Sequence, residues 1–250
     1  MDNAFNPFSL AGKTILITGA ASGIGQATAV ACSKLDARVV LCTRTAERAQ
    51  ETLLKLKGTG HQVLDGDLTV QEVLEKIVSC TPLLEGVVLC AGKGLTLPIL
   101  FSTREKQNEF FEINYNSPVE LLRLLVKKKR VNKGASVVFV CSVGGNSVYN
   151  VGGSVYGASK AALMSTMKYY AKELAPKGIR VNSVNPGMTN TKFIHRGTLS
   201  EEQFKSDMEQ YPLKRYGEPE DIANGIVYLL SNASSWVTGH GLVIDGGISI

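Results

Sequence analysis

The sequence predicts an α/β fold in which helices cover both faces of a doubly wound parallel sheet. Short β-branched runs alternate with longer helical stretches along the chain, beginning at 13–18, 38–43 and 86–90. These runs are apolar across both faces, which is typical of parallel strands buried between two layers of helices. A chain of 250 residues can bury a large core as one α/β unit. We therefore expect a single domain over residues 1–250.

The other elements continue the same βαβ order. The run at 13–18 leads into a glycine-rich loop and then into a helix of small residues at 26–35. Further strands are expected just before residue 66 and at 136–141, 180–185 and 242–244. A second glycine-rich loop covers 144–153, and the irregular polar segment 189–218 is a candidate substrate lid. This order of elements predicts a Rossmann-type sheet.

Composition excludes several classes of protein. No apolar run reaches the roughly 18 residues of a membrane span, and residues 1–10 lack the charged and apolar blocks of a secretory signal, so we expect a cytoplasmic protein without a membrane partner. The five cysteines form no CxxC pair and lie mostly in apolar segments, so we expect reduced thiols and no metal site. They are Cys32, Cys42, Cys80, Cys90 and Cys141.

The loop after the first strand, TGAASGIG at 18–25, has the composition of a dinucleotide-binding loop. Glycines at Gly19, Gly23 and Gly25 allow a tight turn and a close approach to a pyrophosphate, and the following helix presents unpaired N–H groups. Ser22 and Ile24 complete the expected phosphate site. The alternative is a simple turn between a strand and a helix.

The end of the second strand predicts which dinucleotide is used. An NAD enzyme would have a carboxylate there for the free ribose 2′-hydroxyl, but this chain has Thr43 and Arg44. A hydroxyl and a guanidinium suit a 2′-phosphate, so NADP(H) is favoured over NAD(H). The alternative for Arg44 is an exposed loop cation.

Tyr156 and Lys160 carry the expected chemistry. Their four-residue spacing on a helix places both side chains on one face, one turn apart. An ammonium next to the phenol favours the ionised form, which suits general acid/base catalysis. The phenol would protonate a carbonyl oxygen while a nicotinamide delivers hydride to the carbonyl carbon. Ser142 closes the strand at 136–141, and its hydroxyl could bind the same oxygen.

These motifs, with Asn114, resemble the short-chain dehydrogenase/reductase family over residues 12–247. The resemblance implies catalytic roles for Asn114, Ser142, Tyr156 and Lys160. In that family the asparagine kinks a helix and holds a water that links the lysine to solvent. The lysine also holds the nicotinamide ribose hydroxyls.

The resemblance also implies further cofactor residues. Asp67, followed by Leu68, corresponds to the aspartate that meets the adenine amino group, and Ala91 and Gly92 permit close cofactor approach. Cys90 departs from the family, which has asparagine there, and a thiol cannot reproduce an amide's donors and acceptors. The family's PGxxxT turn, which orients the nicotinamide carboxamide, corresponds to Pro186, Gly187, Thr189 and Thr191.

Substrate and partner residues are expected in less regular segments. Tyr149 lacks a lysine four positions later and is assigned to the substrate pocket, together with Phe193 in the lid. The run Lys127-Lys128-Lys129-Arg130 predicts either a solvated helix end or a docking patch for an acidic partner such as acyl carrier protein. Nucleic acid is not expected, because no aromatic residues interleave with the run. The tail at 238–247 matches the family near a subunit interface, which implies a homotetramer.

The sequence therefore predicts an NADPH-dependent oxidoreductase that reduces a carbonyl to a secondary alcohol, most like the bacterial 3-oxoacyl-[acyl-carrier-protein] reductases. Its carbonyl substrate would be a small molecule or an acyl group on a carrier. One alternative is an NAD(P)-dependent dehydrogenase of a free hydroxysteroid, sugar or other secondary alcohol. Another is a non-catalytic dinucleotide sensor.

Overall fold

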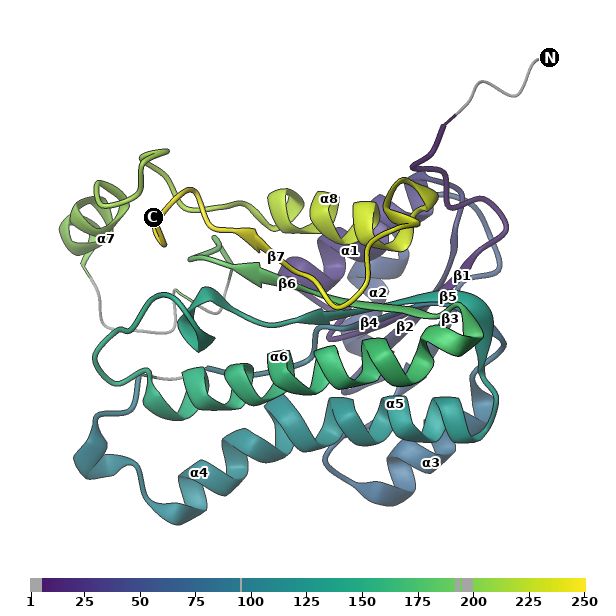
Figure 1. Cartoon of the computed structure of the whole chain (residues 1–250), viewed down its shortest axis with the longest axis horizontal. Coiled ribbons are helices and arrows are strands. Elements are labelled where there is room, and N and C mark those ends of the chain that lie inside the picture. The colour runs from purple at the N-terminus through teal and green to yellow at the C-terminus, as the bar shows by residue number, and fades with distance from the viewer. Residues whose placement is uncertain (1–5, 95, 192–193, 195–199) are drawn as a thin grey trace.

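Seven parallel strands form the central sheet of the computed structural model, which describes residues 6–94, 96–191, 194 and 200–250 (Figure 1). Their order across the sheet is β3-β2-β1-β4-β5-β6-β7. The strands are β1 (Thr14–Thr18), β2 (Arg38–Thr43), β3 (Gln62–Asp65), β4 (Leu84–Leu89), β5 (Val131–Val140), β6 (Arg180–Pro186) and β7 (Gly241–Ile244). The order reverses between β1 and β4, as in a doubly wound sheet. The predicted fold class is confirmed.

Helices cover both faces of the sheet (Figure 1). The α-helices are α1 (Gly23–Lys34), α2 (Ala46–Leu53), α3 (Gln71–Cys80), α4 (Arg104–Phe111), α5 (Ser117–Lys127), α6 (Ser154–Leu174), α7 (Glu201–Met208) and α8 (Pro219–Leu230). Buried side chains of α1, α2 and α8 pack on one face, and those of α3, α5 and α6 pack on the other. None of these helices, across the described ranges, is long and apolar enough to cross a bilayer.

The clearest differences from the predicted elements lie at the start of β5 and in the segment 189–218. β5 begins at Val131 rather than at residue 136, because Val131 pairs with Leu84 across an irregularity in the β4–β5 register. Its polar beginning hid this part of the strand from the sequence pattern. The segment 189–218 contains α7, whose first turn is closed by a capping box between Ser200 and Gln203.

The register places all the predicted chemistry at one edge of the sheet. Ile17 of β1 pairs with Val88 of β4, and Leu89 of β4 pairs with Phe139 of β5. Because the strands are parallel, their carboxyl ends and the loops that follow them lie together. We call this side the catalytic edge, and the side where the strands begin the opposite edge.

Candidate active site

The glycine loop after β1 fits tightly against its surroundings. A Cβ atom on Gly25 would lie 2.3 Å from the carbonyl oxygen of Gly19, and one on Gly19 would lie 3.0 Å from the Cα of Ala91. Gly19 also has a positive φ of 68°. A side chain at either position would collide with neighbouring backbone atoms, so the loop stays without side chains there. The residues present therefore fit a dinucleotide whose phosphates approach the backbone and the helix N-terminus.

Thr18 joins the glycine loop to the end of β4, a role that the sequence analysis missed. Its Oγ1 accepts hydrogen bonds from the N–H groups of Cys90 and Ala91, both at 3.0 Å. The hydroxyl of Thr52 donates to the carbonyl oxygen of Ala20 at 2.9 Å and holds the other side of the loop. Within the described chain, Ser22 precedes α1 without a side-chain capping bond, so its hydroxyl can turn toward a phosphate.

At the end of β2, the two residues predicted to bind a 2′-phosphate differ in exposure. Thr43 is buried, and its hydroxyl donates to the carbonyl oxygen of Thr45 at 2.8 Å. Arg44 is exposed. Hydrogen bonds from the N–H and the hydroxyl of Thr69 lower the pKa of Asp67, and the charge of Arg44 contributes to the same shift. Arg44 thus lies near Asp67, and the neighbouring Leu68 is buried.

Tyr156 and Lys160 lie one turn apart on α6, as their spacing predicts. The Nζ atom of Lys160 lies 5.9 Å from the centre of the Tyr156 ring. Lys160 is 5% exposed, and its Nζ donates to the carbonyl oxygen of Val140 at 2.9 Å. The carbonyl at the end of β5 therefore holds the ammonium beside the phenol ring.

Ser142 borders the same space as Tyr156. Its Oγ accepts a hydrogen bond from the N–H of Gly144 at 3.1 Å. A Cβ on Gly144 would lie 3.4 Å from that Oγ and 4.0 Å from the Cε1 atom of Tyr156. The hydroxyl and the ring thus flank the same glycine. A Cβ on Gly157 would lie 2.4 Å from the carbonyl oxygen of Gly144, so α6 packs closely on this loop.

Asn114 is fully buried in a π-helical turn, Glu112–Asn116, between α4 and α5. Its side chain spans the backbone of Lys93, accepting from the N–H at 2.9 Å and donating to the carbonyl oxygen at 2.9 Å. It also donates to the hydroxyl of Ser159 at 3.1 Å, and that hydroxyl donates to the carbonyl oxygen of Tyr156 at 2.7 Å. Sequence reasoning missed Ser159 because a small polar residue inside a helix carries no distinct pattern.

Gly92 separates Asn114 from Lys160. A Cβ on Gly92 would lie 3.0 Å from the Oδ1 of Asn114 and 3.4 Å from the Nζ of Lys160. Any side chain there would crowd both groups. The four predicted catalytic residues therefore lie in one region, with Asn114 behind Lys160 and with Ser142 beside Tyr156.

Cys90, which replaces the family asparagine, packs among apolar side chains of the core on the α1 and α8 face. Burial raises the pKa of its thiol to about 11, against an opposing effect of the Lys160 charge. The thiol thus behaves as a small apolar group. In the described ranges, no group of three His, Cys, Asp or Glu side chains is placed to hold a metal ion.

The turn after β6 lies against the glycine loop. Gly187, next to Pro186, donates its N–H to the carbonyl oxygen of Ile244 at 3.0 Å. The buried Thr189 donates its hydroxyl to the carbonyl oxygen of Gly187 at 3.1 Å. A Cβ on Gly23 would lie 3.0 Å from the Cγ2 of Thr191. The two predicted parts of the cofactor site are therefore adjacent.

The predicted substrate residues are less enclosed. Tyr149 is 80% exposed, and its hydroxyl donates to the carbonyl oxygen of Asn146 at 3.0 Å. Phe193 lies outside the described residues. The segment that carries α7 is anchored by Tyr211, which is buried and whose Oη accepts from the N–H of Met188 at 3.2 Å, and by Tyr216, whose hydroxyl donates to Asp207 at 2.6 Å.

Comparisons with known proteins agree with this geometry. The family described as enoyl-(acyl carrier protein) reductase matches residues 19–249. The 3-oxoacyl-[acyl-carrier-protein] reductase FabG of Thermotoga maritima is 33% identical, over 96% of this chain and 99% of that protein. A tropinone reductase homologue of Arabidopsis thaliana is 31% identical, over 97% of this chain and 92% of that protein.

The solved structures include a complex of RhlG with NADP from Pseudomonas aeruginosa. It is 28% identical, covers 98% of this chain and all of that chain, and superposes with a TM-score of 0.90. The sequence match, the sheet order and the grouping of the four catalytic candidates all indicate the same family. The chain belongs to the short-chain dehydrogenase/reductase family, whose members are oxidoreductases that use NAD(P).

Proposed function

We propose that this protein uses NADPH to reduce a carbonyl group to a secondary alcohol, with Tyr156 as the proton donor. The observation that carries the proposal is the position of the Lys160 ammonium beside the Tyr156 ring, where it is buried and held by the Val140 carbonyl. A buried ammonium in this place can stabilise negative charge that develops on the tyrosine oxygen as its proton is transferred to the substrate.

Each residue contributes a separate step. The Ser142 hydroxyl donates a hydrogen bond to the substrate oxygen and orients the carbonyl. The Tyr156 hydroxyl then donates its proton to that oxygen, and Lys160 stabilises the phenolate that remains. A bound reduced nicotinamide supplies the hydride that adds to the carbonyl carbon. Asn114 holds the backbone at Lys93 and bonds to Ser159. In this position it supports the path by which Tyr156 regains a proton from solvent.

The preference for NADPH rests on Arg44. No carboxylate ends β2, and the exposed guanidinium near Asp67 is free to turn toward a 2′-phosphate. The Thr43 hydroxyl is engaged with Thr45, so it joins the phosphate site only by giving up that bond. Arg44 therefore contributes most of the selectivity.

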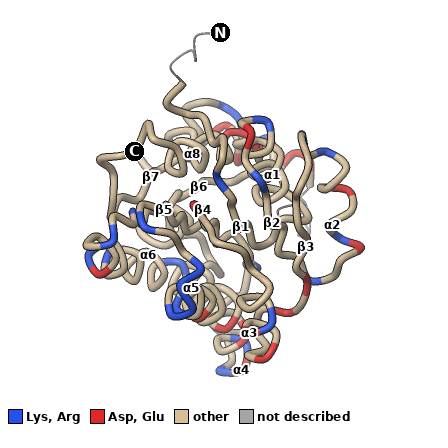
Figure 2. Tube along the Cα trace, turned by 90° about the vertical axis from the view of Figure 1, so that its right-hand side faces the viewer, with Lys and Arg blue, Asp and Glu red and all other residues tan. Residues whose placement is uncertain are grey.

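For the substrate, we propose the carbonyl of a 3-oxoacyl thioester. The support comes from the 33% identity to a 3-oxoacyl-[acyl-carrier-protein] reductase over nearly the whole chain. The basic run of Lys127 to Arg130 is the candidate docking site for an acidic carrier. Lys127 is the last residue of α5, so the run also fits the alternative prediction of a solvated helix end. Figure 2 shows Lys and Arg residues gathered there.

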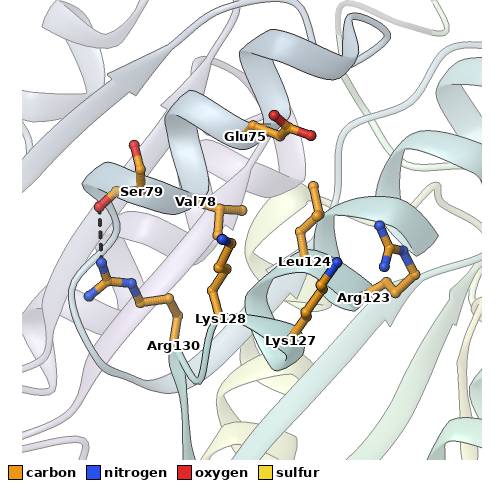
Figure 3. A pocket seen from close by; sticks show the side chains of 8 residues that line it. All are labelled: Glu75, Val78, Ser79, Arg123, Leu124, Lys127, Lys128 and Arg130. Atoms are coloured by element: carbon orange, nitrogen blue, oxygen red, sulfur yellow. Dashed lines mark hydrogen bonds between the residues drawn. The ribbon is translucent and has the colours of Figure 1, made fainter.

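The basic run lies at the opposite edge of the sheet from Tyr156. Lys127, Lys128 and Arg130 of the run, together with Glu75 and Arg123, border a cavity of about 440 Å³ between α3 and α5 (Figure 3). Arg130 donates to the carbonyl oxygen of Ser79 near the end of α3 at 3.1 Å, so this cation also neutralises a helix C-terminus. The ten residues of β5 separate the run from the catalytic edge by roughly 30 Å. A carrier docked there would serve the active site of a neighbouring subunit.

We propose a homotetramer, which would supply such a neighbour. β7 is an edge strand of the sheet, and the loop before it carries Trp236, which is 98% exposed. Val243 of β7 is also exposed. A second copy would cover these apolar groups. Light scattering measures the assembly directly.

The same geometry favours a second candidate function, a dehydrogenase of free secondary alcohols, because the basic run faces away from the catalytic edge. The experiment that decides is NADPH oxidation with acetoacetyl thioesters on acyl carrier protein and on a small thiol, beside a panel of free ketones. Carrier-dependent turnover that Lys128→Glu weakens supports the first proposal. Turnover of free ketones alone, indifferent to Lys128→Glu, supports the second. Absence of turnover on every substrate would contradict both and leave a non-catalytic sensor, whereas unchanged turnover in Tyr156→Phe would show that Tyr156 is not the proton donor.

A further inference from the structure

Apolar side chains are exposed on two loops at the catalytic edge. In the short helix η1 (Ile99–Phe101), which follows β4, Ile99 is 86% exposed, Leu100 88% and Phe101 65%. Val151, in the loop between β5 and α6, is 91% exposed. We call these four residues and Tyr149 the apolar rim. Contiguous exposed apolar groups on a protein surface mark places where another apolar surface binds.

The two loops of the rim are joined to each other. The N–H of Leu97 donates to the carbonyl oxygen of Gly152 at 2.8 Å. A Cβ on Gly152 would lie 2.7 Å from the Cγ2 of Thr96, so the backbones are in close contact. Ile99 follows Leu97 by two residues, and Val151 directly precedes Gly152. The rim therefore extends across both loops.

The rim is also continuous with the catalytic tyrosine. Leu97, Phe110 and Val155 form a small buried cluster, and Tyr156 packs against it. Tyr156 thus packs against a cluster whose member Leu97 lies two residues before Ile99 in the chain. If the carbonyl of a substrate is held at Tyr156, an apolar substituent that extends from it toward the rim meets further apolar side chains.

The loop segments around the rim contain no charged residue, although Lys93, which is paired with Glu109, precedes the first of them. Residues 94–103 and 141–159 contain no Asp, Glu, Lys, Arg or His, although a fifth of the chain is charged. A sugar or a substrate with a charged tail would find no ionic partner within these two segments. An alkyl chain would lose water-exposed surface and gain contacts.

We propose that the apolar rim binds an alkyl chain of the substrate and makes the enzyme selective for carbonyl compounds with long apolar tails. This inference rests on the proposed function and specifies its substrate class. Each methylene buried against the rim is expected to strengthen binding by about two- to fourfold, until the rim is filled. The preference would come from the alkyl chain of the substrate and not from the chemical group at the far end of that alkyl chain.

The test measures binding without turnover. Dissociation constants are determined calorimetrically for 2-alkanols from 2-butanol to 2-decanol in the presence of NADPH, with which an alcohol cannot react. The wild-type constant should fall with each added methylene. In the double variant Ile99→Ser/Leu100→Ser, the dependence on chain length should be nearly flat, while 2-butanol binds as in the wild type. Both side chains are exposed, so the substitutions leave the core intact.

Leu54→Ser is the matched control, because Leu54 is 86% exposed and lies after α2 at the opposite edge. It should retain the wild-type dependence on chain length. Equal dependence in the wild type and the double variant would overturn the proposal. Dissociation of the assembly by the double variant, measured by light scattering with the chain-length dependence unchanged, would also overturn it and assign the rim to contacts between copies. Failure to reduce any ketone would contradict the proposed function, but the alkanol titration would still decide whether the rim binds alkyl chains.

Discussion

The two edges of the sheet differ in what their loops are made of and in how tightly they are packed. At the catalytic edge, the loops are rich in glycine, and a Cβ on Gly19, Gly25 or Gly92 would meet neighbouring atoms at 3.0 Å or less. At the opposite edge, a Cβ on Gly134 would meet nothing within 4 Å, and three residues of the basic run line part of a cavity. The close packing indicates where a ligand must approach the backbone. Charge alone, which is most visible at the opposite edge, does not.

Removal of the proton donor at the catalytic edge should have the largest effect on activity. Tyr156→Phe should lower kcat by roughly 10²- to 10⁴-fold, because the general acid is lost while the ring and its packing remain. NADPH binding, measured by fluorescence, should stay within a few fold of the wild-type value. Tyr169→Phe changes an exposed tyrosine of the same helix and should leave kcat unchanged. Comparable rates for the two variants would remove Tyr156 from the mechanism.

Glycine substitutions test the difference in packing between the edges. Gly25→Ala places a methyl group 2.3 Å from the Gly19 oxygen, so the loop must shift, with an expected loss of about 1–3 kcal/mol in stability and most of the NADPH affinity. Gly134→Ala has open space but a φ of +77°, so it should cost roughly 1–2 kcal/mol through backbone strain alone. Denaturant unfolding and NADPH titration separate the two effects. Normal NADPH affinity in Gly25→Ala would show that the close approach of the loop is not required.

The cofactor preference is a smaller effect at the catalytic edge. Arg44→Ala should raise the dissociation constant of NADPH by about tenfold or more, because a charge-assisted hydrogen bond to the 2′-phosphate is lost. The constant for NADH should hardly change, since NADH lacks that phosphate. Titration of both dinucleotides with both proteins gives the comparison. If the variant lost affinity equally for NADH and NADPH, the guanidinium would not be reading the 2′-phosphate.

Sequence reasoning could place the candidate residues of the catalytic edge near one another because they are tied to the order of the strands. Parallel strands that end at Thr18, Leu89 and Val140 must bring the following loops together, so Gly92 and Ser142 could be placed near Tyr156 without a structure. The hydrogen bonds that hold these loops were not predictable. The contacts of Ser159 with Asn114, and of Thr18 with the end of β4, depend on which side chains meet in three dimensions.

The start of β5 shows the opposite limitation. Its first residues are polar, and only pairing with β4 makes them a strand. Local pattern therefore fails where long-range contacts decide the conformation. The helix α7 was missed for a related reason, since its 8 residues have no buried face and depend on the capping box at Ser200.

Two thiols, one at each edge, should differ in their reactivity toward an alkylating reagent, and this difference should have the smallest effect on activity. Burial raises the pKa of Cys90 to about 11, so at pH 8 only about a thousandth of it is the reactive thiolate. Cys80 is exposed at the end of α3. Iodoacetamide should therefore modify Cys80 first, and ketone reduction should survive this modification, because Cys80 lies at the opposite edge. Mass spectrometry of the modified peptides, beside the residual activity, makes the test. The opposite result would be a rapid loss of activity with label on Cys90, prevented by NADPH. It would mean that the Cys90 thiol is accessible and ionised, and that it does not behave as an inert apolar group.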